Sequence, residues 1–316
     1  MTEVGDQRSP EFKFDPRSIG IATTTFYPNW YPGNSAKQYV VDKIRGDLAL
    51  QTIQESVKNG FQVVVNDGTS SDAFQEELKR LKGEGVIVLA RTEPGMSATR
   101  RQVFQEVSYL PGVKVILWTE PEKTDLVQYA SKISQPILEG KAHLVVIKRE
   151  PELFKQMFPD YMYESEIKAN RRYNNWLRIR GLLKKDQEDL DMFSGPRAFL
   201  NKPQVLELFF KVYEFIGDRV GIQKYADPEM YSDATYFPVV AALAEGLNVV
   251  SVTIPFKYPE EQRKIEETTD PEILEEFIKK RLKQRLGILD DLVQYLQLQR
   301  KSPRAKLREV KKQEKS

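Results

Sequence analysis

The chain has 316 residues, of which 40% are apolar, and this is enough to bury a sizeable core in one large domain or two small ones. Its 48 lysines and arginines nearly balance 46 aspartates and glutamates, so a net charge of +2 gives no reason to expect a nucleic-acid partner. With no cysteine and one histidine, His143, the chain lacks disulfides, thiolate metal sites and any site that needs two imidazoles.

The amino-terminal residues 1–17 are polar, and we interpret them as a flexible lead-in. No stretch of the chain approaches about 18 consecutive apolar residues, and no apolar segment follows the polar start. The sequence therefore predicts neither a membrane span nor a secretory signal, and we expect a cytoplasmic protein whose partner is a small molecule.

From residue 18 onward, short apolar runs alternate with stretches of helical periodicity. Continuous apolar runs that end in turn residues predict strands at 18–25, 61–65, 86–90, 113–119, 143–148 and 247–255. Apolar residues at helical spacing predict helices at 40–58, 72–82, 97–108, 125–138, 204–216 and 230–245. Buried strands separated by amphipathic helices are typical of a mainly parallel sheet covered on both faces, so we expect an α/β fold.

Other segments differ in composition from this alternation. Residues 150–191 are rich in tyrosine, asparagine and arginine, which favours helix with an exposed polar face, and residues 192–200 return to extended structure. Residues 257–300 are highly charged, with apolar positions at helical spacing that predict an extension packed on the main domain by one face. The basic residues 301–316 carry almost no apolar side chain, and we expect them to be disordered.

An acidic pair, Glu120 and Glu122, follows the predicted strand 113–119. It lies at the carboxyl end of that strand, the edge where open α/β sheets bind ligands. Pro121 disfavours helix between the two acids, so both side chains are able to project from an extended turn toward one point. The alternative is an ordinary acidic loop, because 46 acidic residues produce the E-x-E pattern several times by chance.

Three motifs follow one another in a recognisable order: V-V-V-N-D-G-T-S-S-D, then G-M-S-A-T-R-R, then the E-P-E of the acidic pair. They resemble the D-D-G-S-x-D, G-x-x-x-A-R-N and D-x-D motifs of GT-A glycosyltransferases, family 2-like proteins included. The later Y-S-D-A-T-Y-F-P segment and the strand after it resemble the mannosylglycerate-synthase-like, retaining branch. The resemblance implies a GT-A domain at residues 18–256 that binds a nucleotide sugar and catalyses transfer, followed by a helical extension at 257–300.

The resemblance also implies roles for the matching positions. The residues that would bind the donor are Thr24, Thr25, Phe26, Asp67, Gly95, Arg100, Glu120 and Glu122. Among them, Asp67 would accept a hydrogen bond from the nucleobase, and Arg100 would lie along the diphosphate. Asp227 or Asp233 would supply the catalytic acid on the acceptor side.

The D-x-D positions of the family hold a metal, so the resemblance implies that Glu120 and Glu122 bind Mg²⁺ or Mn²⁺. The chain departs from the pattern, because both aspartates are glutamates and no histidine lies near the closing strand. A metal-independent site is therefore the alternative, in which a cation neutralises the diphosphate and the two acids bind sugar hydroxyls. The candidates for that cation are Arg100, Arg149 and Arg172.

The first function that this resemblance implies is transfer of a hexose from a UDP- or GDP-linked sugar to a small-molecule or glycan acceptor, with retention of configuration. The alternative is a non-catalytic protein that binds nucleotide sugars through a degenerate D-x-D site. Sugar nucleotidyl transfer ranks third, because that chemistry needs a glycine-rich phosphate loop after the first strand, and T-T-T-F-Y-P-N-W-Y provides none. The donor sugar, the acceptor and the oligomeric state stay open.

Overall fold

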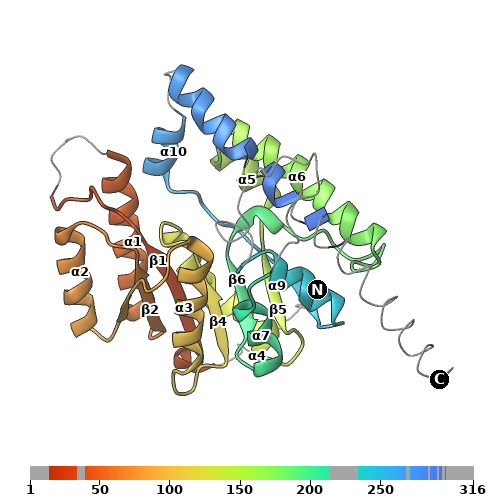
Figure 1. The fold of residues 1–316 in the computed structure, drawn as a ribbon, viewed down its shortest axis with the longest axis horizontal. Helices are drawn as coiled ribbons and strands as arrows, with labels where there is room; N and C mark the ends of the chain where they lie inside the picture. The colour runs from red at the N-terminus through yellow and green to blue at the C-terminus, as the bar shows by residue number, and fades with distance from the viewer. Residues whose placement is uncertain are drawn as a thin grey trace, which may run out of the picture.

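A computed structural model describes residues 14–33, 40–213, 234–267, 271–283, 285–289, 292–293 and 296 of the chain. These residues form a seven-stranded sheet with the strand order β3-β2-β1-β4-β6-β5-β7 (Figure 1). The strands are β1 (Ile19–Thr25), β2 (Gln62–Asp67), β3 (Ile87–Ala90), β4 (Val115–Trp118), β5 (Leu144–Arg149), β6 (Arg197–Leu200) and β7 (Val249–Ile254). Each predicted strand is confirmed to within a few residues.

One strand of the sheet runs against the others. β6 is antiparallel to both β4 and β5, whereas the remaining neighbours are parallel. The register places Trp118 opposite Arg197, so the amino end of β6 lies at the same edge as the carboxyl ends of the other strands. The predicted mainly parallel sheet is confirmed, and the segment predicted as extended at 192–200 supplies its one reversed strand.

Helices cover both faces of this sheet (Figure 1). They are α1 (Val40–Lys58), α2 (Asp72–Gly83), α3 (Met96–Ser108), α4 (Ala130–Leu138), α5 (Pro151–Met157), α6 (Asp160–Ile179), α7 (Pro203–Phe210), α9 (Phe237–Ala244) and α10 (Glu260–Glu266). Three short 3₁₀ turns join them, η1 (Pro16–Ser18), η2 (Thr124–Tyr129) and η3 (Met192–Ser194). The expected α/β fold with both faces covered is confirmed.

Alternation along the strands divides the interior into two cores. In β2, Val63 and Val65 face the core shared with α1, α2 and α4, whereas Val64 faces the core shared with α3, α7 and α9. Successive side chains of a strand point to opposite faces, so an uninterrupted apolar run fills both cores at once. This is the physical reason why these strands lack polar alternation in the sequence.

Three α-helices are shorter than predicted. The α-helix expected at 125–138 begins at Ala130, because the residues before it form the 3₁₀ turn η2. The helix expected at 204–216 ends at Phe210, and residues 211–213 are not helical. The helix expected at 230–245 begins at Phe237, after a turn at 234–236. Residues 214–233 lie outside the described part of the chain, and so do the segments 1–13 and 297–316, which contain most of the predicted lead-in and the predicted basic tail.

The carboxyl-terminal part of the chain belongs to the main core. Residues 271–283 and 285–289 are helical, and we call them the C-terminal helical segment. Buried Ile288 joins the core around α3, together with Leu292 and Leu296, which follow the segment. Buried Arg285 bonds to Glu166 of α6, so the segment lies along that helix (Figure 1). Ile288, Leu292 and Leu296 thus pack on the main domain, whereas Ile273 and Leu282, which the same prediction placed on the packed face, are 44% and 51% exposed.

No helix in the described ranges has the length and apolar character needed to cross a bilayer.

Candidate functional site

The site lies where the strand order of the sheet reverses. From β1 the chain adds β2 and β3 on one side, and then returns to place β4 on the other side of β1. In open α/β sheets the connections diverge at such a point and leave a crevice outside the carboxyl ends of the strands. The Oγ1 of Thr23 donates to the carbonyl of Thr119 at 2.9 Å, which ties the two strand ends together just below the predicted acidic pair.

Glu122 is buried and turned toward α1. Its Oε1 accepts a hydrogen bond of 2.9 Å from the hydroxyl of Tyr27 and forms a 2.6 Å ion pair with Arg45 of α1. The Glu122 carboxylate is the main reason why the pKa of Arg45 lies above its ordinary value. Burial, followed by the same carboxylate, raises the pKa of Tyr27 well above its ordinary value. Glu122 therefore ties α1 to the loop after β1.

Glu120 is turned instead toward the loop before β6. Its Oε2 pairs with Lys123 at 3.0 Å, and the Lys123 ammonium also donates to the carbonyl of Ser194. Burial alone would raise the pKa of Glu120, but Lys123 and Arg100 outweigh it, and the pKa lies below its ordinary value. Glu120 is consequently ionised at neutral pH, and its partly exposed side chain is the acid that faces the switch-point crevice.

The two acids do not form a metal centre in this arrangement. Each carboxylate already has its own cation, Arg45 for Glu122 and Lys123 for Glu120. Across the described ranges, no group of three or more acidic or histidine side chains is placed to hold a metal ion. Divalent cations such as Mg²⁺ need several converging oxygen ligands, so these side chains as placed do not fit a shared ion. Metal binding by Glu120 and Glu122 stays a prediction, and the positions of the two side chains do not support it.

The predicted base-binding acid has contacts within the chain. Asp67 accepts hydrogen bonds from Thr25 Oγ1 at 2.8 Å, from Ser70 N at 2.9 Å and from Ser70 Oγ at 2.6 Å. These bonds hold a turn in which Thr69 adopts a φ of 78°. Asp67 thus stabilises the loop between β2 and α2, and its contact with a nucleobase remains a prediction. Phe26, beside this loop, is 58% exposed at the same edge.

The predicted diphosphate side is formed by the start of α3. Gly95 is the N-cap residue with a φ of 100°, a conformation that favours glycine. Arg100, in the second turn, is buried and lies 5.0 Å from the ring of Trp118 at the end of β4. Burial lowers the pKa of Arg100, and Glu120 acts in the opposite direction. Arg100 and Glu120 therefore lie near enough to act on each other's pKa, and their contact with a donor stays a prediction. Asp227 and Asp233 lie outside the described residues.

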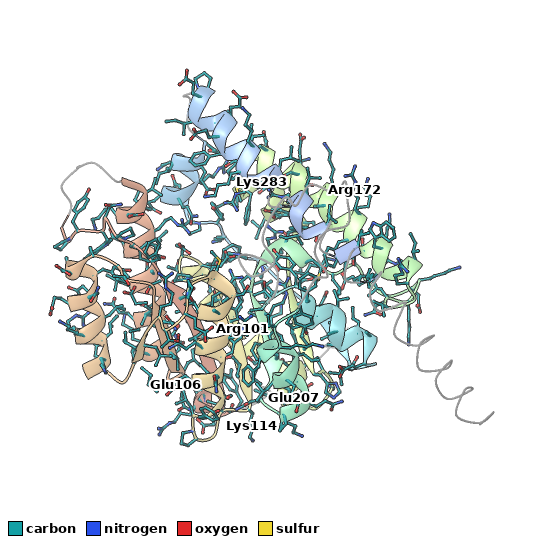
Figure 2. The ribbon with its side chains drawn as sticks, in the orientation of Figure 1. Arg101, Glu106, Lys114, Arg172, Glu207 and Lys283 are labelled. Atoms are coloured by element: carbon teal, nitrogen blue, oxygen red, sulfur yellow. The ribbon has the colours of Figure 1, made fainter. Side chains whose placement is uncertain are left out.

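The other two candidate cations have different environments. Arg149 is buried at the end of β5 and donates to Asp191 from Nε and Nη2, both at 2.8 Å, and to Glu166 from Nη1 at 2.6 Å. These acids engage its guanidinium, so Arg149 stabilises the fold rather than an external anion. Arg172 lies exposed on α6, on the opposite side of the molecule from Lys114 at the amino end of β4 (Figure 2).

Several charged groups at this edge were not predicted. Arg197 of β6 is fully buried, with its guanidinium 5.9 Å from the ring of Tyr236. The C-terminal helical segment adds Arg281, which lies 3.5 Å from Glu266 of α10. Glu266 in turn accepts a 2.7 Å hydrogen bond from the hydroxyl of Tyr258. No motif in the sequence indicates these contacts, even though Tyr258 and Glu266 are only eight residues apart.

Gly195 makes the position of Glu120 testable. It has a φ of +87°, and a Cβ atom there would lie 2.5 Å from Glu120 Oε1. We expect Gly195→Ala to displace the Glu120 carboxylate and to destabilise the protein beyond the roughly 1–2 kcal/mol of a left-handed non-glycine residue. Gly140→Ala shows the cost of a positive φ without a clash, because Gly140 has a φ of +72° and open space around it. Since the ψ of −67° at Gly195 adds a backbone cost of its own, the decisive comparison is Gly195→Ala in the wild-type and Glu120→Ala backgrounds. Equal losses of unfolding free energy in the two backgrounds, measured in urea, would contradict the placement of Glu120.

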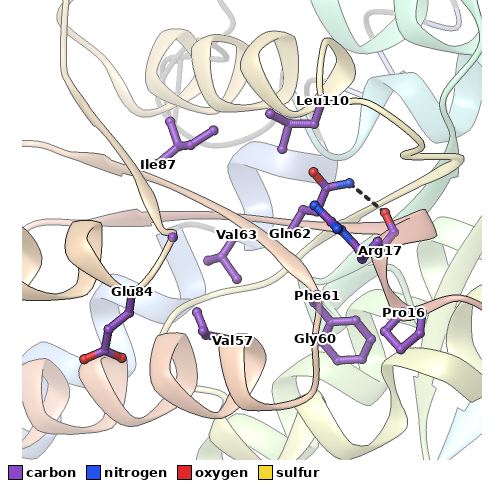
Figure 3. A pocket seen from close by; sticks show the side chains of 11 residues that line it. Pro16, Arg17, Val57, Gly60, Phe61, Gln62, Val63, Glu84, Ile87 and Leu110 are labelled. Carbon is purple, nitrogen blue, oxygen red and sulfur yellow. Dashed lines mark hydrogen bonds between the residues drawn. The ribbon is translucent and has the colours of Figure 1, made fainter.

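A pocket of about 530 Å³ lies at the opposite edge of the sheet (Figure 3). Its walls are largely apolar side chains of Val57, Phe61, Val63, Ile87 and Leu110. The Gln62 amide at this pocket donates to the carbonyl of Arg17 at 2.7 Å. The pocket lies at the amino ends of β2 and β3, away from the charged crevice, and we assign it no role in the candidate site.

No protein-family model matches the chain, and no curated protein matches it in sequence. Among solved structures, a nucleotide-diphospho-sugar transferase from Desulfovibrio desulfuricans aligns with 87% of this chain and 97% of its own length, at 10% identity and a TM-score of 0.38. TarS residues 1–349 from S. aureus align over 85% of this chain and 71% of that one, at 11% identity and a TM-score of 0.39.

TarS 1–349 has also been solved with UDP-GlcNAc; that structure aligns with 42% of this chain and 34% of its own length, at 14% identity and a TM-score of 0.28. A 4-diphosphocytidyl-2C-methyl-D-erythritol synthase from Anaerococcus prevotii aligns with 79% of this chain and 97% of its own, at 11% identity and a TM-score of 0.37. Likeness at this level concerns the fold alone, and no residue role passes from these proteins to this chain.

Proposed function

We propose that this protein is a glycosyltransferase that takes a hexose from a nucleotide diphosphate sugar. The observation that carries the proposal is the group of three cations around the ionised Glu120 at the switch-point crevice. Lys123 pairs with Glu120 at 3.0 Å, and the charge of Glu120 acts on the buried guanidinium groups of Arg100 and Arg197.

Three cations around one acid at a ligand-binding switch point suit a nucleotide diphosphate, which carries several negative charges in a compact group. When the bond between sugar and diphosphate breaks, negative charge grows on the leaving group, and fixed cations stabilise it. The sugar gains positive charge at the same time, as in other glycosyl chemistry, and the ionised Glu120 in the crevice would stabilise that charge. Glu120 and Glu122 each form an ion pair with a basic side chain, and this supports the metal-independent form of the reaction.

The non-catalytic alternative is also consistent with the ion pairs of the acidic residues. A protein that only binds nucleotide sugars would keep the cations while its acids became salt-bridged, and Glu122 is buried in such a pair. The two alternatives differ in turnover, because only the enzyme releases free nucleotide from the sugar conjugate. The motif resemblance alone supports three further parts of the proposal: retention of configuration, a UDP- or GDP-linked donor, and a small-molecule or glycan acceptor.

A thermal-shift screen of the full chain against UDP, GDP, ADP and their sugar conjugates tests the proposal. Each ligand is tested with EDTA and with added Mg²⁺ or Mn²⁺, and a ligand at 100 times its dissociation constant should add about 2.7 kcal/mol of stability. We expect a shift with at least one diphosphate and nucleotide release from its sugar conjugate, both in EDTA. A flat response to the whole panel would reject the proposal, and a shift without nucleotide release would favour the non-catalytic alternative.

A further inference from the structure

A short turn before β6 contacts both Glu120 and its cation. This turn comprises residues 192–196, and we call it the 192–196 turn. Its Ser194 carbonyl accepts a hydrogen bond from the Lys123 ammonium, and Lys123 pairs with Glu120 at 3.0 Å. At Gly195 the backbone lies so close to Glu120 that a Cβ atom would be 2.5 Å from Oε1. The place of this turn therefore determines where both members of the Glu120–Lys123 pair can lie.

Arg197, the first residue of β6, holds the 192–196 turn from the interior of the protein. Its Nη1 donates to Ser194 Oγ at 3.1 Å and to the carbonyl of Pro196 at 2.7 Å, and its Nη2 donates to the carbonyl of Met192. The three acceptors are spread over the turn, so one guanidinium group connects its beginning to its end. Arg197 is fully buried, and it forms no ion pair within the described part of the chain.

This position requires the shape of arginine as well as its charge. Removing a charge from water is costly unless hydrogen bonds compensate, and the bonds to the turn provide that compensation. They come from two nitrogens of a rigid, planar guanidinium group, an arrangement that the single ammonium of lysine does not reproduce. Burial lowers the pKa of Arg197, and Glu120 is among the groups that act in the opposite direction. Arg197 and Glu120 therefore also interact through their charges.

The start of the turn has a second attachment, to α6. Asn170 Oδ1 accepts a hydrogen bond from Met192 N at 2.8 Å, and Asn170 Nδ2 donates to Asp191 Oδ1 at 2.8 Å. The bonds of Arg197 reach further along the turn, to the residues on either side of Gly195. Loss of Arg197 should therefore leave the start of the turn in place and release the part that carries Gly195.

We propose that Arg197 is a positioning residue, which holds Glu120 and Lys123 in their reactive arrangement through the 192–196 turn. The inference rests on the proposed function for the role of Glu120 in the reaction, whereas the link between Arg197 and the Glu120–Lys123 pair rests on the contacts themselves. A fully buried side chain does not touch the ligand, so Arg197 affects the reaction through Glu120. Displacement of a reacting group lowers kcat more than it weakens binding of the donor.

Arg197→Lys tests this positioning, because it keeps the charge and changes the geometry. We expect kcat for nucleotide release from the sugar conjugate to fall about 10- to 100-fold, the order of loss for a group misplaced by about 1 Å, while the KM of the donor changes little. Arg197→Met has neither the charge nor the donors, and its kcat should fall at least as far. Ser194→Ala removes one of the three bonds and keeps the carbonyl that Lys123 uses, so we expect a smaller fall in kcat.

Arg178→Lys is the matched control. Arg178 of α6 also holds a loop, since its Nη2 donates to the carbonyl of Gln187 at 2.8 Å and its Nη1 pairs with Asp189 at 2.5 Å. Among the described residues, this loop makes no hydrogen bond or ion pair with the Glu120–Lys123 pair, so kcat and KM should match the wild type. A fall in kcat equal to that of Arg197→Lys would overturn the inference.

A double-mutant cycle measures the same link without turnover. Arg197 and Lys123 share Ser194 as a partner, one at its hydroxyl and the other at its carbonyl. Unfolding free energies in urea are compared for Arg197→Lys, Lys123→Met and the double variant. We expect the losses to be non-additive, because residues with a shared partner are coupled, and we expect the losses of Arg178→Lys and Lys123→Met to add.

The outcomes separate this inference from the proposed function. Additive losses for Arg197→Lys and Lys123→Met would overturn the inference whether or not the protein transfers sugar. Turnover with an unchanged kcat in Arg197→Lys would keep the proposed function and remove the positioning role. A wild type that releases no nucleotide, together with non-additive losses, would reject the proposed function and keep the link to the Glu120–Lys123 pair. If Arg197→Lys does not fold, Ser194→Ala takes its place in both measurements, and an unchanged kcat with additive losses would overturn the inference.

Discussion

Replacing Asp191 by asparagine is expected to lower the free energy of unfolding by about 3–5 kcal/mol, the usual cost of leaving one partner of a buried ion pair without its counter-charge. Asp191 accepts two 2.8 Å hydrogen bonds from the Arg149 guanidinium and a third from Asn170 Nδ2. Asparagine has nearly the same volume, so the loss will come from charge and hydrogen bonding rather than from packing. Urea unfolding followed by circular dichroism measures it.

Asp189→Asn is the control for this measurement. Asp189 also pairs with an arginine, Arg178 of α6, at 2.5 Å, but its side chain is about half exposed. Exposed pairs contribute about 0–1 kcal/mol, so this variant should unfold close to the wild type. A loss in Asp189→Asn equal to that in Asp191→Asn would show that burial of the Arg149 pair is not what makes it important.

The pH dependence of the Asp191 contribution has a defined sign. Burial alone would raise the pKa of Asp191, but Arg149 outweighs it and the folded-state pKa lies below the ordinary value. The stability from this pair is therefore fully present above the unfolded-state pKa of about 3.9 and is lost as pH falls through the lower folded-state pKa. The difference in stability between wild type and Asp191→Asn should accordingly shrink in acid and stay constant around neutral pH.

The second large effect is expected on turnover. In the proposed reaction Glu120 is the ionised group nearest the developing positive charge of the sugar, and Glu120→Gln removes that charge without removing bulk. Loss of one electrostatic group of this kind costs about 10²- to 10³-fold in kcat. Nucleotide release from the sugar conjugate should fall by this factor, while the affinity for UDP should be retained or rise, because Lys123 loses its acid partner.

Glu139→Gln provides the comparison, since Glu139 also pairs with a lysine, Lys141, at 2.6 Å, in the connection between α4 and β5 at the other end of the sheet. This variant should turn over as the wild type does. An undiminished kcat in Glu120→Gln would remove Glu120 from the reaction. Turnover abolished by EDTA and restored by Mg²⁺ or Mn²⁺ would instead favour the metal site that the acidic pair predicts.

Local sequence pattern predicted the part of the fold that depends on near neighbours. The turn at Asn59–Gly60 ended α1 as expected, and Ser71 caps α2 by accepting a hydrogen bond from Phe74 N. What the pattern could not provide is the partner of each strand. The run before Leu200 reads as extended, but its antiparallel position between β4 and β5 depends on segments more than fifty residues upstream.

The same limit applies to the site. Spacing placed Glu120 and Glu122 at the correct edge, but it could not indicate that Arg45 would engage one and Lys123 the other. For residues 150–191, the polar composition predicted a helix with a solvated face. In the structure, Glu166 and Asn174 of α6 are instead buried and hydrogen-bonded. A buried polar residue looks like a surface residue in the sequence until its partner is known.

The pairing of Glu166 with Arg285 has a consequence for the order in which the chain is made. These residues are 119 positions apart. At roughly 5–20 residues per second, the ribosome adds Arg285 about 6–24 s after Glu166. During that interval the carboxylate has Arg149 on one side and water on the other, so α6 cannot complete its packing. Arg281, Ile288, Leu292 and Leu296 are added in the same late stretch, so the carboxyl edge gains its last cations and the core around α3 its last apolar side chains only at the end of synthesis.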